Sequence, residues 1–134
     1  MSKVLIVPEG SSKSGRAFSQ AVKFDVGEAE MIFVSGLLPK DELKNVVGEG
    51  DIEAQTRCVF EKMITILKEA GADLGDLVKV DIYLVDMKRD FEKVSAIRNG
   101  YLMESKPAAT TVGITSTMTD GCDIEIDAVA MRKK

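Results

Sequence analysis

Residues 122–128, CDIEIDA, alternate between apolar or small side chains and acidic ones. Successive side chains of a β-strand point to opposite faces of its sheet, so this period of two predicts a strand with one apolar and one acidic face. Two interpretations of the acidic face stay open. It is either the solvated face of an ordinary strand or, if copies of the chain associate through it, a place where a partly desolvated carboxyl group can exchange protons with water.

The rest of the chain supplies strand and helix patterns on the N-terminal side of this strand. Strands are predicted over 4–7, 18–26, 31–35, 78–85, 109–115 and 122–131. A helix is predicted over 51–70, because Asp51 suits the N-cap, apolar residues recur at helical spacing and Gly71 suits the C-terminal turn. A second helix is expected to begin at Asp90 and to end before Pro107, with an apolar stripe of Phe91, Val94, Ile97, Tyr101 and Leu102.

The resulting order, βββαβαββ, predicts an α+β fold with a mixed, mostly antiparallel sheet and two helices on one face. We expect a single domain over residues 1–134. The opposite face of the sheet is left bare. Several of its predicted residues are uncharged or apolar, which favours association of copies into a homo-oligomer; they are Phe18, Tyr83, Thr111 and Gly113.

Composition excludes several kinds of site. The chain has 134 residues, no histidine and a formal net charge of −4, so mechanisms built on imidazole are impossible and nucleic acid is disfavoured as a partner. The cysteines Cys58 and Cys122 lack the spacing of a metal site. The apolar run 4–7 is too short for a signal peptide or a membrane span, so we expect a cytoplasmic protein without a membrane partner.

Taken together, the motifs resemble the reactive intermediate deaminase family, known as RidA or YjgF. The matching stretches follow one another through nearly the whole chain: 18–22 (FSQAV), 33–36 (FVSG), 50–57 (GDIEAQTR), 78–84 (VKVDIYL), 106–108 (KPA) and 124–130 (IEIDAVA). The resemblance implies a chorismate-mutase-like fold and a homotrimer with small-molecule clefts between subunits. It also implies hydrolysis of reactive enamines and imines to 2-keto acids and ammonia, without a metal or cofactor.

The resemblance implies roles for individual residues. Glu125 occupies the position of the glutamate that handles water and protons, and Ser35 and Gly36 match the serine-glycine pair of the cleft. Thr111 occupies a cleft position whose backbone amide often meets the ligand. Ser95 stands where the second helix often carries an asparagine.

Two positions depart from the family pattern. Ala109 stands where an arginine clamps the substrate carboxylate, and Phe18 stands where a tyrosine lines the cleft. Guanidinium forms two parallel bonds to a carboxylate, a geometry that alanine cannot provide. Charged hydrogen bonds contribute about 1.5–3 kcal/mol each, so the loss predicts about ten-fold to more than a hundred-fold weaker binding of 2-imino acids.

Three explanations of Ala109 remain open. Arg98 or Arg16 supplies a substitute cation, or the ligand lacks a carboxylate there and meets an apolar pocket of Phe18, Ala109 and Thr110, or the protein binds without catalysis. The leading hypothesis is a deaminase of altered substrate preference with Glu125 as its catalytic group. The alternative is a non-catalytic, metabolite-binding or regulatory trimer.

Overall fold

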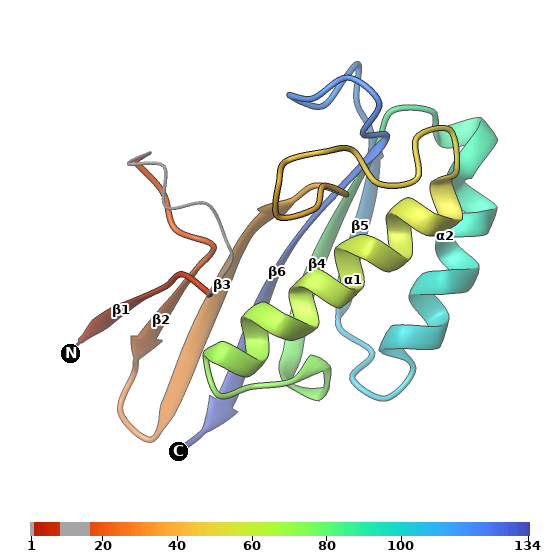
Figure 1. Ribbon diagram of the computed structural model, residues 1–134. Coiled ribbons are helices and arrows are strands. Elements are labelled where there is room, and N and C mark those ends of the chain that lie inside the picture. Colours follow the sequence, from red (N-terminus) through yellow and green to blue (C-terminus); the bar gives the residue numbers. More distant parts are fainter. Residues whose placement is uncertain (1, 9–16) are drawn as a thin grey trace.

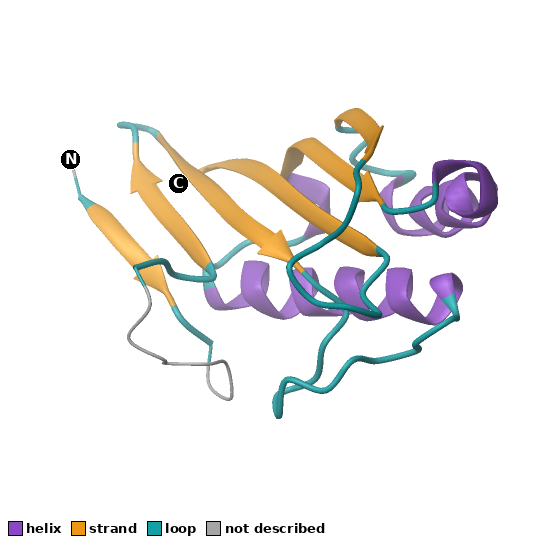
Figure 2. Cartoon of the chain, turned by 90° about the horizontal axis from the view of Figure 1, so that it is seen from above, coloured by secondary structure: helices purple, strands orange, loops and turns teal. Residues whose placement is uncertain are grey.

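The computed structural model describes residues 2–8 and 17–134 as a sheet covered by helices on one face (Figures 1 and 2). Its elements are β1 (Lys3–Ile6), β2 (Ala21–Asp25), β3 (Ala29–Leu37), α1 (Ile52–Glu69), the short 3₁₀ helix η1 (Leu74–Asp76), β4 (Leu77–Leu84), α2 (Met87–Leu102), β5 (Ala108–Gly113) and β6 (Ile124–Lys133). The α+β class and the predicted order of strands and helices are confirmed.

Strand β6 lies inside the sheet, although it comes last in the chain. The sheet has six strands in the order β1-β2-β3-β6-β4-β5. β6 pairs antiparallel with both β3 and β4, whereas β4 and β5 are parallel and are connected through α2. The mostly antiparallel, mixed sheet is therefore as predicted, and β5 forms one of its edges.

The alternation of β6 separates the core from the open face. Ile124, Ile126 and Ala128 are buried beneath the helices, and the intervening acids are only partly buried. The apolar side of α1 contributes Val59, Phe60 and Met63 to the same core, among other residues. Burial of such side chains from water is the main force holding helix to sheet.

Helix α1 is fixed to the start of β6 by a buried amide. Gln55 donates from Nε2 to the carbonyl oxygen of Gly121 at 2.6 Å and accepts from the backbone N–H of Asp123 at 2.9 Å. Its side chain thereby satisfies the backbone polar groups that precede the strand. Asp51 caps the helix as predicted, accepting from the amide of Ala54, and Gly71 has a φ of +84°.

The second helix begins four residues earlier than predicted. Asp86, not Asp90, is the N-cap of α2, and its carboxylate accepts from the amide of Arg89 at 3.1 Å. Asp90 is instead buried in the first turn and binds the Arg89 guanidinium through two hydrogen bonds of 2.9 and 2.7 Å. Both aspartates suit a cap by residue type, and only the path of the chain after β4 selects Asp86.

The start of β4 also differs from the prediction. Strict alternation places Val78 in the core, yet Val78 is 45% exposed and Leu77 is 3% exposed. The pairing of β4 with β6 shifts between Leu77 and Lys79, so an extra residue there reverses the faces at the beginning of the strand.

Replacement of Leu77 by alanine is expected to lower the free energy of unfolding by about 2–5 kcal/mol, because it leaves a cavity in the core. Val78→Ala is the matched control and is expected to cost less than about 1 kcal/mol, since that side chain is exposed. Urea unfolding of both variants measures the difference. Equal losses would contradict the shift in register.

Candidate functional site

The candidate site lies on the sheet face that the helices leave open. Glu125 is a direct partner of Tyr83 in the β4–β6 pairing, and Asp127 is a partner of Asp81. Partnered residues project to the same side of a sheet, so these four side chains share the open face. Its acidic side chains therefore lie at the middle of the sheet and not at its edge.

The Glu125 carboxyl group lies directly against Gly36 of β3. A Cβ atom at residue 36 would lie 2.3 Å from Glu125 Oε2 and 2.9 Å from its carboxyl carbon, well inside contact distance. The pairing of β3 with β6 is irregular between Val34 and Leu37, where the Ser35-Gly36 pair lies. Glycine at this irregularity leaves the space that the carboxyl group occupies.

The environment of Glu125 favours its protonated form. Partial burial raises the pKa of its carboxyl group, and the negative charge of Asp127 on the same strand raises it further. A carboxyl group with a raised pKa can donate a proton at a pH closer to neutrality than an exposed glutamate can. Burial also raises the pKa of Asp127, so Glu125 and Asp127 are both candidates for a proton-exchanging carboxyl group on this face.

Ser35, which precedes Gly36 in β3, binds the segment that follows Phe18. Its hydroxyl donates to the carbonyl oxygen of Ser19 at 2.6 Å, and its backbone amide donates to the carbonyl oxygen of Gln20 at 2.9 Å. Phe18 precedes β2 and is 61% exposed, although the sequence places it inside that strand. Arg16, a candidate cation, lies outside the described residues.

The residues of β5 do not meet Glu125 within one chain, because β4 lies between the two strands. Thr110 shares the open face, and its hydroxyl accepts from Lys79 Nζ at 3.1 Å. Thr111 pairs with the buried Ile82 and so projects toward the helix side, as does Gly113, which pairs with Leu84. The expectation that Thr111 and Gly113 share the bare face with Tyr83 is wrong, since the β4–β5 register sets the opposite alternation. Ala109 pairs with the buried Val80, so it also projects toward the helix side, and it is exposed at the sheet edge.

Ser95 and Arg98 lie on α2, which covers the other face of the sheet (Figure 2). The Arg98 guanidinium donates from Nη2 to Ser95 Oγ at 2.8 Å and also contacts the side chain of Asn99. Within one chain these two residues are therefore separated from Glu125 by the sheet.

A hydrogen-bonded group of side chains beside Glu125 was not anticipated. The Tyr83 hydroxyl donates to Asp127 Oδ2 at 2.9 Å, and Lys79 Nζ forms a short hydrogen bond with Asp81 Oδ1. The hydrogen bond to Asp127 raises the pKa of Tyr83 to about 12. The alternation of residues 79, 81 and 83 predicts that their side chains share one face of the sheet. Which residues of β6 they contact depends on the cross-strand register, which the sequence does not show.

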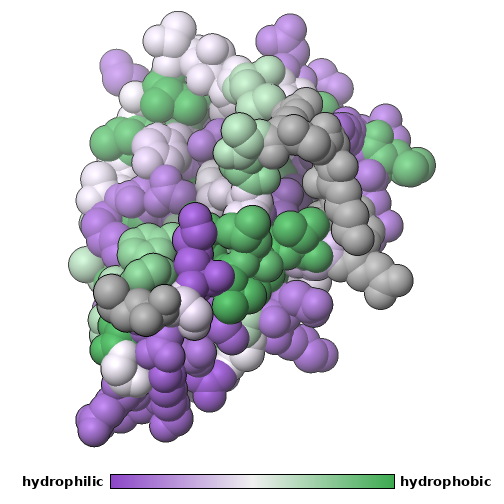
Figure 3. Space-filling model, turned by 90° about the vertical axis from the view of Figure 1, so that its left-hand side faces the viewer, coloured by the Kyte–Doolittle hydropathy of each residue, from purple (hydrophilic) through white to green (hydrophobic). Residues whose placement is uncertain are grey.

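The open face becomes apolar toward β1. Leu5, Val22, Phe33 and Val129 are successive cross-strand partners from β1 to β6, and Leu5 and Phe33 remain 59% and 46% exposed. Seen from the side of β1, the surface carries a hydrophobic patch among polar side chains (Figure 3). Exposed apolar surface of this kind favours contact with another protein surface.

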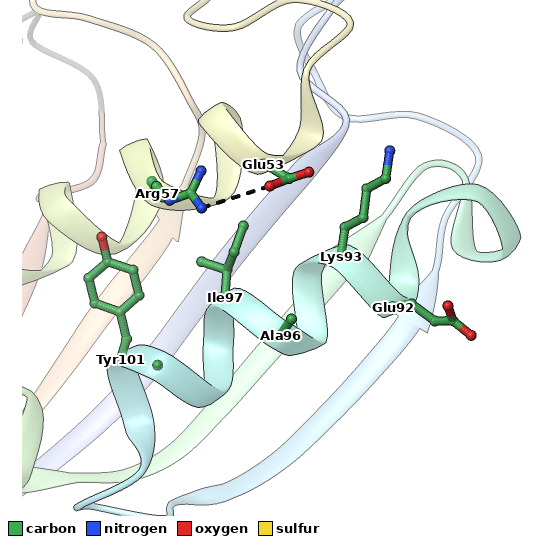
Figure 4. Close-up of a pocket in the computed structure, with 8 residues that line it drawn as sticks. Glu53, Arg57, Glu92, Lys93, Ala96, Ile97 and Tyr101 are labelled. Carbon is green, nitrogen blue, oxygen red and sulfur yellow. Dashed lines mark ion pairs between the residues drawn. The ribbon is translucent and has the colours of Figure 1, made fainter.

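A second hollow lies between the two helices and is not part of this site. It has a volume of about 640 Å³ and is lined by Glu53, Arg57, Glu92, Lys93, Ala96, Ile97, Gly100 and Tyr101 (Figure 4). Arg57 there pairs with Glu53 at 3.8 Å. Because this hollow is on the helix layer, it does not communicate with Glu125.

The described parts of the chain, 2–8 and 17–134, offer neither a metal site nor a membrane-spanning helix. Within them, no cluster of three or more histidine, cysteine, aspartate or glutamate residues has the arrangement of a metal site. None of the helices there is long and apolar enough to cross a membrane.

Comparison with known proteins gives consistent matches over the whole fold. The family model described as Endoribonuclease L-PSP matches residues 11–132. A RutC family protein of Pyrococcus abyssi is 40% identical over 133 residues, which are 99% of this chain and 100% of that protein. The 3-aminoacrylate deaminase RutC of Acinetobacter baylyi is 36% identical, over 97% of this chain and 98% of its own. The crystal structure of the YjgF gene product of E. coli superposes with a TM-score of 0.80 at 28% identity, covering 97% of this chain and 99% of that one.

Replacement of Gly36 by alanine is expected to lower the free energy of unfolding by about 1–3 kcal/mol, because the added methyl group overlaps the Glu125 carboxyl group and forces it away. Gly100→Ala is the control, since nothing lies within 4 Å of a Cβ at that helical position. It is expected to stabilise by about 0.5–1 kcal/mol. Urea unfolding measures both. A neutral Gly36→Ala would contradict this cost and show that the Glu125 carboxyl group, at the end of a flexible side chain, moves aside freely.

Proposed function

The chain belongs to the Endoribonuclease L-PSP family, which includes the RidA and YjgF proteins, and on this premise we propose that it is a hydrolytic deaminase of reactive enamines and imines. The observation that carries the proposal is the partly buried Glu125 carboxyl group, with its raised pKa, packed against Gly36 on an open sheet face. The relative named 3-aminoacrylate deaminase supports the same class of substrate, because 3-aminoacrylate is an enamine.

Glu125 can serve each proton transfer that the reaction needs. In its acid form it protonates an enamine at carbon or an imine at nitrogen, giving an iminium carbon that water can attack. The resulting carboxylate accepts a proton from the attacking water as the C–O bond forms. It returns that proton to nitrogen and then takes up the hydroxyl proton as the C–N bond breaks, so ammonia and a carbonyl product leave and the acid form of Glu125 is restored. Water supplies the oxygen, and electrons and protons balance without an oxidant or reductant.

The site is proposed to be completed by a second copy of the chain in a homotrimer. In one chain β4 separates Glu125 from Ala109, Thr110 and Thr111, so a neighbouring β5 edge must approach if these residues are to contact the same ligand. The exposed apolar row from Leu5 to Val129 offers surface for such contact. Ser95 and Arg98 are likewise proposed to reach the ligand only in this assembly, and Arg16, which lies outside the described residues, stays a candidate cation.

Substrate preference is proposed to differ from that of members with an arginine at position 109. Ala109 and Phe18 give this part of the cleft no cation and no phenolic hydroxyl, which weakens binding of a carboxylate at that point. Gly36 lies against the Glu125 carboxyl group, and Ser35 precedes it in β3. The proposed enzyme therefore keeps the proton-transferring part of the site and changes the part that holds the rest of the substrate.

The absence of arginine at position 109 also favours a second candidate function. A trimer of the same architecture with no carboxylate clamp would bind a metabolite and act as a sensor or regulator without turning it over. This alternative uses the same cleft and differs only in whether bound ligand is hydrolysed.

Replacement of Glu125 by alanine is expected to reduce keto-acid release from 2-aminoacrylate, generated in place by a dehydratase, by about 10²–10⁴-fold relative to the wild-type acceleration. Glu69→Ala, an exposed position on α1, is the control and is expected to retain full activity. Absence of any acceleration by the wild-type protein would refute deaminase activity on this substrate. Thermal-shift measurements with carboxylated and uncharged ligands would then test the binding alternative.

Replacement of Ala109 by arginine is expected to raise kcat/KM for carboxylated imines by about ten-fold or more, because it restores a bidentate partner for the carboxylate. Ala108→Arg is the matched control, since adjacent residues of β5 project to opposite faces. Steady-state kinetics with carboxylated and uncharged imines measures the effect. Equal gains from both variants would show that any added positive charge suffices.

A further inference from the structure

Two carboxyl groups of β6 compete for a proton in the candidate site. Glu125 and Asp127 project from the same face two residues apart, and the negative charge of Asp127 acts on Glu125. Both are partly buried, and burial raises the pKa of each. Neighbouring carboxyl groups of this kind titrate as a pair, so something in the structure must decide which of them takes the first proton.

The surroundings of the two groups are unequal. Asp127 accepts a hydrogen bond from the Tyr83 hydroxyl at 2.9 Å, which stabilises its anionic form, whereas Glu125 has the bare backbone of Gly36 beside it. Asp81, which Lys79 binds, faces Asp127 across the strands and raises the pKa of Asp127 through a hydrogen bond and its negative charge, so the Tyr83 hydroxyl acts against Asp81 and burial. The titratable groups that β4 presents to the pair are Lys79, Asp81 and Tyr83; β3 presents Ser35 and Gly36, which do not titrate.

We propose that Tyr83 is a positioning residue that directs the proton of the site toward Glu125, because its hydroxyl hydrogen bond stabilises the anionic form of Asp127. The retained negative charge on Asp127 then favours the neutral form of Glu125, which is the form that begins hydrolysis. Environments that separate two adjacent carboxyl groups in this way assign the acid role to one of them. The inference rests on the proposed function for its catalytic meaning, but its electrostatic content can be measured without substrate.

The direct test is a titration of the side-chain carboxyl carbons by ¹³C NMR in the intact protein. Tyr83→Phe removes the hydrogen bond, so the pKa of Asp127 is expected to rise and that of Glu125 to fall. Tyr101→Phe is the matched control, because its hydroxyl donates to Glu61 at 2.8 Å on the helix side of the sheet. It is expected to change neither titration. An unchanged Glu125 titration in Tyr83→Phe would overturn the proposal.

Two substitutions at Asp127 distinguish the effect of its charge on the pKa of Glu125 from the effect of its size. Asp127→Asn keeps the size of the side chain but removes its charge, so the pKa of Glu125 is expected to fall, whereas Asp127→Glu keeps the charge and is expected to restore it. Asp123→Asn is the control, since Asp123 is also two residues from Glu125 but its carboxylate binds Arg89 at 2.9 Å. A fall in the pKa of Glu125 as large in Asp123→Asn as in Asp127→Asn would overturn the role of Asp127.

The catalytic readout is the pH dependence of kcat. A group that must be protonated gives a rate that declines as pH rises through its pKa. With that pKa lowered, Tyr83→Phe and Asp127→Asn are expected to lose several-fold in kcat above neutral pH and to approach the wild-type rate in acid. A loss that is equal at every pH would indicate a merely structural role and overturn the proposal. A different outcome is that the variants show the expected changes in carboxyl titration but the wild-type protein has no deaminase activity. That outcome would refute the proposed function and leave the proton assignment standing.

Discussion

The structure depends on the two-sided character of β6. This strand is paired along both edges, so it has no freedom to turn, and its buried isoleucines hold it against α1. The intervening acids are consequently carried to the middle of the open face, where they are only partly hydrated. Hydrophobic burial on one side of a strand thus determines the electrostatics of the other, because a shift by one residue would exchange the two faces.

Local sequence patterns were sufficient for the elements and for part of the site. Alternation identified β6, and cap and glycine positions gave both ends of α1, because these signals lie within one segment. The failures all involve contacts between segments. The exposure of Val78, the orientation of Thr111 and the Tyr83–Asp127 hydrogen bond depend on how β4 is aligned with its neighbours. The choice of Asp86 over Asp90 as cap likewise depends on where the chain leaves the sheet.

The candidate site combines a retained half and an altered half. Glu125, Ser35 and Gly36 match the family pattern and lie together in one chain, where backbone pairing and one hydroxyl hold them. Ala109 and Phe18 depart from it, and both are exposed in the single chain. Exposed edge positions can change without loss of stability, whereas a change at the irregular pairing of β3 and β6 would displace the acid. Under the proposed function, this division would allow substrate preference to differ while the proton-transferring carboxyl group is kept.

The two hydrogen bonds of Gln55 limit which residue types position 55 can hold. It donates to the carbonyl oxygen of Gly121 and accepts from the backbone amide of Asp123. The position therefore requires a side chain of this length that ends in both a hydrogen-bond donor and an acceptor. Glutamate lacks the donor, asparagine is one methylene shorter, and leucine would leave both backbone groups unsatisfied in the interior. Few substitutions at residue 55 can therefore preserve both hydrogen bonds, even though this amide is not part of the candidate site.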